Sequence, residues 1–335
     1  MNGSKILFNT GLSINLIFLI LLFFGINSSS FNLELPIITL ITPFLIIVNA
    51  IFFIYWLSQL KWPAILFLLY LAFGFDSWKL VYQFKSDAVI TSKGLDIMSF
   101  NVRSFNRFRW LDKENIPGSI AAFIKQVSPD VICFQEFAED LSPEFEDYPF
   151  KVFKPYVVDG HIGSSIISKY PLLNSKAISF AKSTNGGMQS DLIWKRDTFR
   201  LYNIHFESLR FDRNENLLYS KEYIKSVKKI KHVFDLQKQQ AVKFKDILIS
   251  NDYPEIICTD LNNNAFSKNY TYLTNNRYDA FTEKGSGFGA TYKFQYLPIR
   301  IDYIFTSKKI KVIDFNVHDI SLSDHKPISA TLKWP

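Results

Sequence analysis

The sequence predicts an α/β layered domain over its last three-quarters, preceded by a hydrophobic N-terminal region. Two observations support this division of the 335 residues. Residues 1–86 carry only four lysines and two acidic side chains, whereas the remainder has the charge density of an ordinary soluble protein. From Leu95 onward, short apolar runs alternate with polar turns and with a few amphipathic stretches. A segment of about 240 residues is long enough to bury a large core.

The apolar runs after Leu95 are typical of strands, because they are four to eight residues long and rich in β-branched and aromatic side chains. They read LDIMSFNV, DVICFQEF, GSSIISKY, FRLYNIHF, EIICTDLN, RIDYIFTS and ISATLKW. Helices are expected at about 118–126 and at 219–249, where apolar residues recur at helical spacing. Cys133 and Cys258 lie inside apolar runs, so we expect buried free thiols.

The hydrophobic region contains three apolar runs, at about 6–26, 35–57 and 62–78. The first two carry no charge and reach the roughly 20 residues that a bilayer-spanning helix requires. The third is shorter and reaches that length only past Asp76. A secretory signal would explain the first run, but no small-residue cleavage site follows it. We predict a transmembrane region at 1–86 with two to three helices, a linker at 87–94 and a soluble domain at 95–335.

The charges flanking these runs indicate an orientation. Lys5 precedes the first run, Glu34 separates the first two, and Lys61 separates the second from the third. The positive-inside rule then places the N-terminus and Lys61 in the cytoplasm. Three spans would put the soluble domain outside the cytoplasm, in the periplasm of a Gram-negative cell, and two spans would leave it inside. We predict a multi-pass membrane protein with an extracytoplasmic domain.

Polar side chains close many of the predicted strands, and we expect them at the C-terminal ends, which converge on one crevice in a layered α/β domain. Each one alone would be an ordinary turn cap or core residue. Together they supply carboxylates, amides and imidazoles. They are Asn101, Gln135, Glu136, His205, Asp260, Asn262, Asp302, Ser323, Asp324 and His325.

These residue types suit one chemistry. Carboxylate and amide oxygens, without cysteine, favour Mg²⁺ or Mn²⁺ over zinc. Such a cation polarises a phosphoryl oxygen and stabilises charge on the leaving oxygen. Attack of water on phosphorus also needs a base and an acid, which aspartate and histidine provide. The sequence therefore predicts a divalent-metal-dependent phosphoester hydrolase.

The same residues resemble those of the endonuclease/exonuclease/phosphatase superfamily, which includes deoxyribonuclease I, apurinic-site endonucleases, neutral sphingomyelinases and inositol-polyphosphate 5-phosphatases. The resemblance covers about 95–334, with the motif blocks FNVR, DVICFQE, GSSIISKYPL, YNIH, TDLN, RIDYIF and SDHKPI in the order of the family. It implies a four-layer α/β/β/α sandwich, with two mixed β-sheets packed face to face and helices outside.

The resemblance also implies a metal and phosphate site. Glu136 would be the main ligand of Mg²⁺ (or Mn²⁺), with Asn101 beside it, and Asp324 would be a second carboxylate on the metal side. Arg103, two residues after Asn101, would contact the phosphate of the substrate.

The remaining motif residues would carry out the reaction. Asp260 would orient or deprotonate the attacking water, and Asn262 would hold the phosphate or that water. Asp302 and His325 would form a dyad that stabilises the phosphoryl transition state or acts as base. His205 would contact the phosphate and help to protonate the leaving oxygen, as in the deoxyribonuclease I-like and sphingomyelinase-like branches.

The sequence departs from the family pattern around Asp260. Thr259 stands where a glycine commonly precedes the motif, and Asn263, Asn264 and Ala265 replace the usual proline and aspartate. These changes would alter the local backbone and the fit of the substrate. We expect the loops between strands to select the substrate: 107–115, the surroundings of His161, 182–189, 206–216 and 283–289.

Three functions are compatible with these observations. The first is a membrane-tethered phosphodiesterase or nuclease-like hydrolase, and the second is a lipid-directed hydrolase (sphingomyelinase-like, phosphoinositide-directed or related to glycosylphosphatidylinositol anchors). The third is a non-catalytic membrane scaffold. The expected partners are a phosphoester substrate (nucleic acid, phospholipid or sugar phosphate) and membrane lipid, without an obligate protein partner. Eight lysines at 221–245 would form a solvated face, contact anionic lipid or hold nucleic-acid phosphates.

Overall fold

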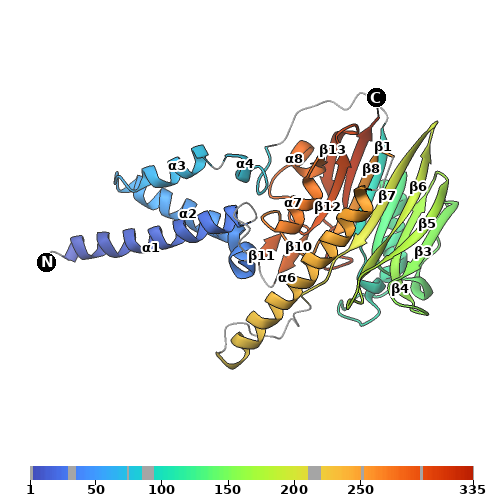
Figure 1. The fold of residues 1–335 in the computed structure, drawn as a ribbon, viewed down its shortest axis with the longest axis horizontal. Coiled ribbons are helices and arrows are strands. Elements are labelled where there is room, and N and C mark those ends of the chain that lie inside the picture. Colours follow the sequence, from blue (N-terminus) through green and yellow to red (C-terminus); the bar gives the residue numbers. More distant parts are fainter. Residues whose placement is uncertain are drawn as a thin grey trace.

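The computed structural model describes residues 3–28, 35–73, 75–84, 94–209, 220–249, 253–294 and 297–334. An α/β domain carries a bundle of N-terminal helices that projects away from it (Figure 1). Most of the predicted linker at 87–94 and part of the loop at 206–216 lie outside the described residues. The predicted fold class is confirmed, because two mixed β-sheets pack face to face with helices outside them.

The first sheet has six strands in the order β13-β14-β1-β2-β4-β3. Strands β1 and β2 are parallel and the other pairs are antiparallel. The strands are β1 (Leu95–Asn101), β2 (Val131–Ala138), β3 (Phe150–Pro155), β4 (Ile162–Ser168), β13 (Lys311–Val317) and β14 (Ile328–Lys333).

The second sheet also has six strands, in the order β5-β6-β7-β8-β12-β9, and β7 and β8 are its parallel pair. The strands are β5 (Leu172–Ser179), β6 (Gly186–Trp194), β7 (Asp197–His205), β8 (Glu255–Asp260), β9 (Arg277–Asp279) and β12 (Asp302–Ser307). A separate hairpin joins β10 (Tyr292–Phe294) to β11 (Leu297–Ile299).

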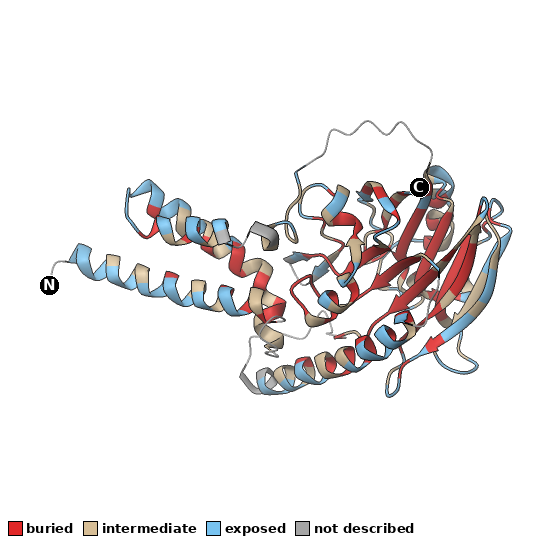
Figure 2. Cartoon of the chain, turned by 45° about the horizontal axis from the view of Figure 1, so that its top comes forward, coloured by how far each residue is buried: buried red, intermediate tan, exposed pale blue. Residues whose placement is uncertain are grey.

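The main core lies between the sheets, where Ile97 and Cys133 of the first meet Leu201 and Cys258 of the second. Both cysteines are buried free thiols, as predicted. Figure 2 shows the buried strands in the middle of the domain and exposed helix faces outside them.

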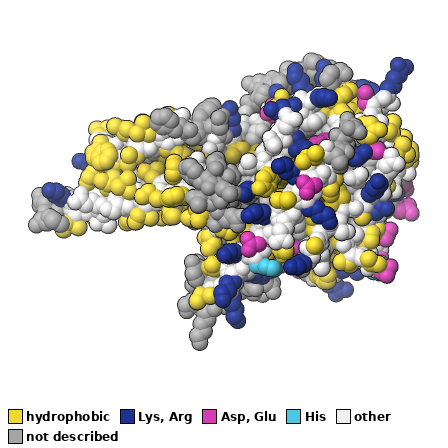
Figure 3. Space-filling model, viewed as in Figure 1, with side chains coloured by type: hydrophobic (Ala, Val, Ile, Leu, Met, Phe, Trp, Pro, Cys, Tyr) yellow, Lys and Arg dark blue, Asp and Glu magenta, His cyan; other side chains and the backbone are white. Residues whose placement is uncertain are grey.

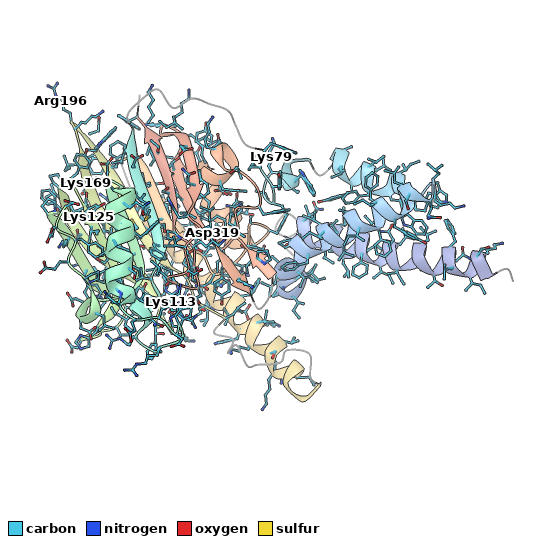
Figure 4. The ribbon with its side chains drawn as sticks, turned by 180° about the vertical axis from the view of Figure 1, so that it is seen from behind. Lys79, Lys113, Lys125, Lys169, Arg196 and Asp319 are labelled. Atoms are coloured by element: carbon cyan, nitrogen blue, oxygen red, sulfur yellow. The ribbon has the colours of Figure 1, made fainter. Side chains whose placement is uncertain are left out.

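The outer layers are amphipathic helices. Helix α5 (Ile116–Val127) covers the first sheet with Ile120 and Ile124, and Figure 4 shows this face, with Lys125 on the helix. Helix α6 (Ser220–Ile249) is one continuous helix, which covers the second sheet with Phe244 and Leu248. The shorter helices are α7 (Lys268–Thr274), α8 (Ala280–Lys284), η1 (Arg103–Asn106) and η2 (Glu139–Leu141).

The N-terminal region contains α1 (Gly3–Asn27), α2 (Pro36–Ser58), α3 (Ala64–Phe73) and α4 (Phe75–Trp78). The third predicted run contains α3 and α4, which lie on either side of residue 74, outside the described residues. Helices α1 and α2 are antiparallel, because Trp56 near the end of α2 packs on Phe8 near the start of α1, with ring centroids 5.4 Å apart. Buried polar side chains join them: Asn15 donates to Asn49 over 3.2 Å and accepts from the indole of Trp56 over 3.1 Å.

Helices α1 and α2 are long and apolar enough to cross a membrane. In their most apolar windows only 11% and 33% of the residues are buried, so neither helix is mostly buried within the protein. Apolar side chains such as Ile17 and Ile54 are exposed. Figure 3 shows the projecting bundle covered by hydrophobic side chains, in contrast to the mixed surface of the α/β domain.

The first turns of α2 pack against the α/β domain. Leu40 contacts Leu209 and Ile230 in a small buried cluster. The side-chain amide of Asn264 donates to the carbonyl oxygens of Thr39 over 2.7 Å and of Leu40 over 3.2 Å. The Thr39 carbonyl is free to accept because Pro43, four residues later in α2, has no N–H. Asn264, one of the departures from the family pattern, therefore holds α2 on the domain.

Candidate active site

The predicted site residues meet in one pocket of about 780 Å³ at one end of both sheets. Its lining includes Arg103, Glu136, His205, Asn262, Asp324 and His325. Asn101, Asp260 and Asp302 are buried beneath them, each at most 2% exposed. We call these nine residues the pocket floor. Four of the five predicted substrate loops contribute to the walls, through Phe108, His161, Thr184 and Ser208, whereas 283–289 does not.

A β-bulge in β2 turns Glu136 into the pocket. The pairing of β2 with β4 shifts by one residue between Phe134 and Phe137, so Gln135 and Glu136 together face a single residue of β4. Glu136 has φ +48°, and its N–H donates to the hydroxyl of Tyr156 over 3.1 Å. Gln135 points the other way and donates to Asn203 over 2.8 Å in the core. Adjacent residues of one strand thus have separate roles.

Asn101 joins the two sheets at the pocket floor. It ends β1 of the first sheet, and its amide donates to Asp260 of the second sheet over 2.9 Å and to Glu136 over 3.3 Å. Its side-chain oxygen accepts from the N–H of Arg103 over 3.0 Å. This amide therefore fixes the spacing of two carboxylates that would otherwise repel each other.

Asp302 and His325 form a hydrogen-bonded pair. Both Asp302 oxygens lie near His325 Nδ1, at 3.1 and 3.0 Å, and His325 Nε2 lies 3.7 Å from Asp260. Burial alone would lower the pKa of His325, but the charges of Asp302 and Asp260 outweigh it and raise the pKa well above 6.5. The two carboxylates therefore favour the protonated form of this imidazole, which faces the pocket.

The expectation that all these residues follow the C-terminal ends of strands is wrong for Asp302, Asp324 and His325. Asp302 is the first residue of β12. It reaches the site because β12 runs antiparallel to β8, which pairs Asp302 with Asp260. Asp324 and His325 lie in the segment before β14. Because β12 and β14 run antiparallel to β8 and β1, they begin at the edge of the sheets where β8 and β1 end.

The two remaining carboxylates of the floor hold their protons more tightly than usual. Burial raises the pKa of Asp260 to about 7; the positive charge of His325 opposes this shift and the negative charge of Asp302 adds to it. Burial also raises the pKa of Glu136, helped by the nearby negative charge of Asp324. A cation bound at these oxygens would reverse both effects.

His205 ends β7 and lies between the two carboxylates, with Nε2 3.5 Å from Asp260 and 3.7 Å from Glu136. Asn185 places its amide 3.4 Å from the same nitrogen and donates to the Phe206 carbonyl over 2.8 Å. The ring of Tyr156 packs 5.6 Å from that of His205. No sequence motif marks Tyr156, and Asn185 was predicted only as part of the 182–189 loop.

Arg103 and Asp324 form the open side of the floor. Arg103 Nη1 lies 2.5 Å from an oxygen of Asp324, and its guanidinium stacks on Trp110 at 4.6 Å from the ring centroid. Arg103 begins a left-handed turn in which four successive non-glycine residues have positive φ. Such backbone strain is concentrated at functional sites, and here it turns the arginine side chain back over the pocket.

Hydrogen bonds to neighbouring residues hold the backbone of Asn262 in a left-handed conformation. Its φ is +51°, its N–H donates to Asp260 over 2.9 Å, and its amide donates to the Phe206 carbonyl over 3.0 Å. The side chain lines the pocket directly beside Asp260.

The residues of the floor fit a hard divalent cation, because they offer carboxylate and amide oxygens and no thiolate. Ligand atoms of Asp260, Asp302 and His325 lie within 4.8 Å of one another, close enough for one ion. However, both oxygens of Asp302 already lie within hydrogen-bond distance of His325 Nδ1, which makes this group a poorer position for an ion. Glu136 is the better position, since its side chain is 31% exposed and faces the pocket. A 180° flip of the Asn101 side-chain amide would point its oxygen toward the same ion position beside Glu136.

A buried network of carboxylates and histidines thus lies at the edge of two packed mixed sheets. A sequence model of the Endonuclease/Exonuclease/phosphatase family matches residues 98–325. The chain therefore belongs to this family, whose members are generally dependent on divalent metal ions.

Solved structures support the fold. A humanized D. rerio TDP2 is 17% identical with a TM-score of 0.56, and the match covers 72% of this chain and 100% of that one. An endonuclease/exonuclease/phosphatase from Bacteroides vulgatus is 19% identical with a TM-score of 0.55, over 73% and 100% of the two chains. The human Nocturnin catalytic domain is 16% identical with a TM-score of 0.54, over 74% and 96%. A search of curated proteins found no match.

Proposed function

We propose that the protein is a membrane-tethered, divalent-metal-dependent phosphoester hydrolase. The observation that carries the proposal is the pocket floor, where four carboxylates, two histidines and an arginine gather at one cavity. The Nocturnin domain was solved with a bound sulfate anion, so a related fold binds a tetrahedral oxyanion. Other similar structures are a TDP2 complex with a single strand DNA product and a mannosyl-6-phosphatase, so the fold alone selects no leaving group.

Glu136 and Asn101 would hold a Mg²⁺ or Mn²⁺ ion, which neutralises charge on the phosphoryl group and on the leaving oxygen. Asp260 accepts the proton of the attacking water, and Asn262 orients that water or a phosphoryl oxygen. The His325 cation, held by Asp302, donates to the phosphoryl oxygen that gains charge in the transition state. Arg103 contacts the phosphate, with Asp324 beside the metal position, and His205 helps to protonate the departing oxygen.

The tether is the N-terminal region at 1–86. Helices α1 and α2, together with α3 and α4, lie side by side as a bundle whose far end carries the N-terminus (Figure 1). Lys5 in α1 and Lys61 before α3 lie at that far end, which the positive-inside rule places in the cytoplasm. The α/β domain at 95–335 would then lie on the opposite, extracytoplasmic side.

The test is hydrolysis of bis-p-nitrophenyl phosphate by the full chain in detergent micelles. We expect release of p-nitrophenol with Mg²⁺ or Mn²⁺, no release with chelator, and a loss of at least about 10²-fold in Glu136→Gln. Glu139→Gln is the matched control, because Glu139 is exposed and lies three residues further along. A wild-type chain without metal-dependent activity on any phosphoester would overturn the proposal and favour a scaffold.

A further inference from the structure

An apolar crevice adjoins the catalytic pocket on the side of α2. Its volume is about 150 Å³. Helix α2, the segment after α4 and the β10–β11 hairpin each contribute a wall. The lining is apolar apart from Asn264 and Arg300, and it includes Pro43, Phe44, Ile47, Leu80, Phe288 and Pro298. We call this cavity the α2 crevice. Ile299 lines both the crevice and the catalytic pocket, so the two cavities share this side chain.

Helix α2 runs past both cavities. Leu40 lines the catalytic pocket, and Pro43, Phe44 and Ile47 line the crevice. These positions span two helical turns, or about 10 Å. A molecule with its phosphate in the pocket and an apolar chain along α2 would therefore occupy both cavities without bending around an obstacle on the helix.

The position of α2 beside the pocket is fixed by buried contacts. The amide of Asn264 binds the carbonyl that Pro43 leaves unpaired, and Asn264 is only two residues from Asn262 of the pocket floor. At the other wall, Gln83 and Gly287 exchange backbone hydrogen bonds of 2.9 and 2.8 Å. The helix bundle is thus joined to the domain on both sides of the crevice.

Along the axis of the helix bundle, the crevice lies at the same level as exposed apolar side chains of the bundle. Gly25 of α1 is in close contact with Thr42 of α2, so Phe23 and Phe24 are at the level of Pro43 and Phe44. They are 52% and 36% exposed, and a bilayer that covers them reaches the crevice.

Exposed aromatic rings mark the rim of the crevice. Phe288 is 57% exposed and packs on Tyr82, with ring centroids 5.0 Å apart. Aromatic rings are enriched at the interface between membrane and water. Figure 4 places Lys79, just before this segment, at the junction between bundle and domain.

We propose that the substrate is a membrane-borne phosphoester whose phosphate occupies the catalytic pocket and whose hydrocarbon chain occupies the α2 crevice. This inference rests on the proposed function. In the reaction, the oxygen of water bonds to phosphorus, one ester P–O bond breaks, and the departing alcohol takes up a proton.

The pocket walls favour such a substrate over a nucleic acid. A polyanion is held by rows of lysine and arginine side chains. Among the described residues that line the pocket, Arg103 is the only lysine or arginine, and it is paired with Asp324. The walls instead carry Leu40, Leu209 and Phe108.

The test compares two phosphodiesters with the same leaving group, methyl p-nitrophenyl phosphate and hexadecyl p-nitrophenyl phosphate. The full chain is assayed in the same detergent micelles with Mg²⁺. We expect the hexadecyl ester to have a kcat/KM at least about tenfold higher, because part of its chain leaves water for the crevice. The variant Ile47→Trp fills the crevice, and we expect it to lower kcat/KM for the hexadecyl ester about tenfold while leaving the methyl ester unchanged.

Ile51→Trp is the matched control, one turn further along α2 at a position that is 61% exposed and does not line the crevice. It should leave both esters unchanged, which separates chain binding from simple enrichment of the hexadecyl ester in micelles. Equal kcat/KM for both esters, equal effects of both variants, or faster cleavage of plasmid DNA would overturn the inference while the proposed function stands. If neither ester is cleaved and DNA is also intact, the proposed function itself fails.

A second readout does not depend on turnover. A phospholipid with a photoreactive diazirine in its acyl chain is incorporated into nanodiscs with the full-length Glu136→Gln chain. We expect crosslinks at Phe44, Ile47 or Phe288, and their loss in the Ile47→Trp background. Crosslinks spread evenly over the exposed faces of α1 and α2 would contradict a specific chain site.

Discussion

The pocket floor and the α2 crevice lie side by side but are built in opposite ways. The floor is polar, and its side chains are held by hydrogen bonds between the two sheets, such as those of Asn101 and Asp302. The crevice is apolar and is completed by a helix from outside the α/β domain. The difference indicates that the floor determines the reaction and the crevice determines which substrate reaches it. Changes in the floor should then affect every substrate, and changes in the crevice only some.

The largest effect is expected from Asp302→Asn. The amide occupies the same space, but it no longer supports the charged form of His325, so the pKa of His325 falls and its tautomer is no longer fixed. We expect kcat to fall by about 10³-fold on every phosphoester, with the unfolding temperature little changed. His232→Gln, on the exposed face of α6, is the control. A loss of activity confined to long-chain substrates would contradict the claim that the floor determines the reaction and the crevice determines the substrate.

Measurements of metal binding should show whether the ion is held by Glu136 or by the group of Asp260, Asp302 and His325. We expect Glu136→Gln to weaken Mn²⁺ binding at least about tenfold, measured by electron paramagnetic resonance on the full chain. Asp302→Asn should weaken it much less, because Asp302 bonds to His325. If instead Asp302→Asn removes the Mn²⁺ signal and Glu136→Gln keeps it, the ion lies at the dyad and the roles proposed above are reversed.

The pH dependence follows from Asp260, which must be ionised to accept a proton. Burial raises its pKa to about 7 in the absence of a cation, so activity should fall as the pH drops through the neutral range. A bound cation favours the ionised carboxylate, and higher Mg²⁺ should therefore move the acid limb of the kcat/KM profile to lower pH. An acid limb that does not respond to Mg²⁺ would place Asp260 out of reach of the metal charge.

The smallest effect is expected at the contact between α2 and the domain. Asn264→Ala should cost about 1–3 kcal/mol in the free energy of unfolding, because it leaves the buried Thr39 carbonyl unpaired. In a Pro43→Ala background the restored N–H of residue 43 satisfies the Thr39 carbonyl, so the same substitution should cost less. A double-mutant cycle by thermal unfolding measures this coupling, which we expect to be about 1 kcal/mol. Strict additivity would show that the two residues do not share this carbonyl.

The sequence predicted the fold class well, because strand runs and motif blocks depend on neighbouring residues. It also named the residues that line the floor. It could not place Tyr156, since a tyrosine after a strand carries no local signal, and the bulge at Glu136 depends on pairing with β4.

Local sequence patterns also could not predict the role of Asn264. Its partner is the backbone of Thr39, 225 positions away in the sequence, and the free carbonyl exists only because Pro43 interrupts the hydrogen bonding of α2. From the sequence, the departure at 263–265 indicated a change in substrate fit. In the structure, this segment connects the pocket floor to helix α2, which lines the crevice.

The most direct test of the account is kcat/KM for the methyl and hexadecyl esters in Glu136→Gln and Ile47→Trp, assayed side by side. We predict that Glu136→Gln lowers both values by the same factor and that Ile47→Trp lowers only the value for the hexadecyl ester. A Glu136→Gln chain that spared either ester, or an Ile47→Trp chain that lowered both equally, would contradict the separation of chemistry from substrate selection.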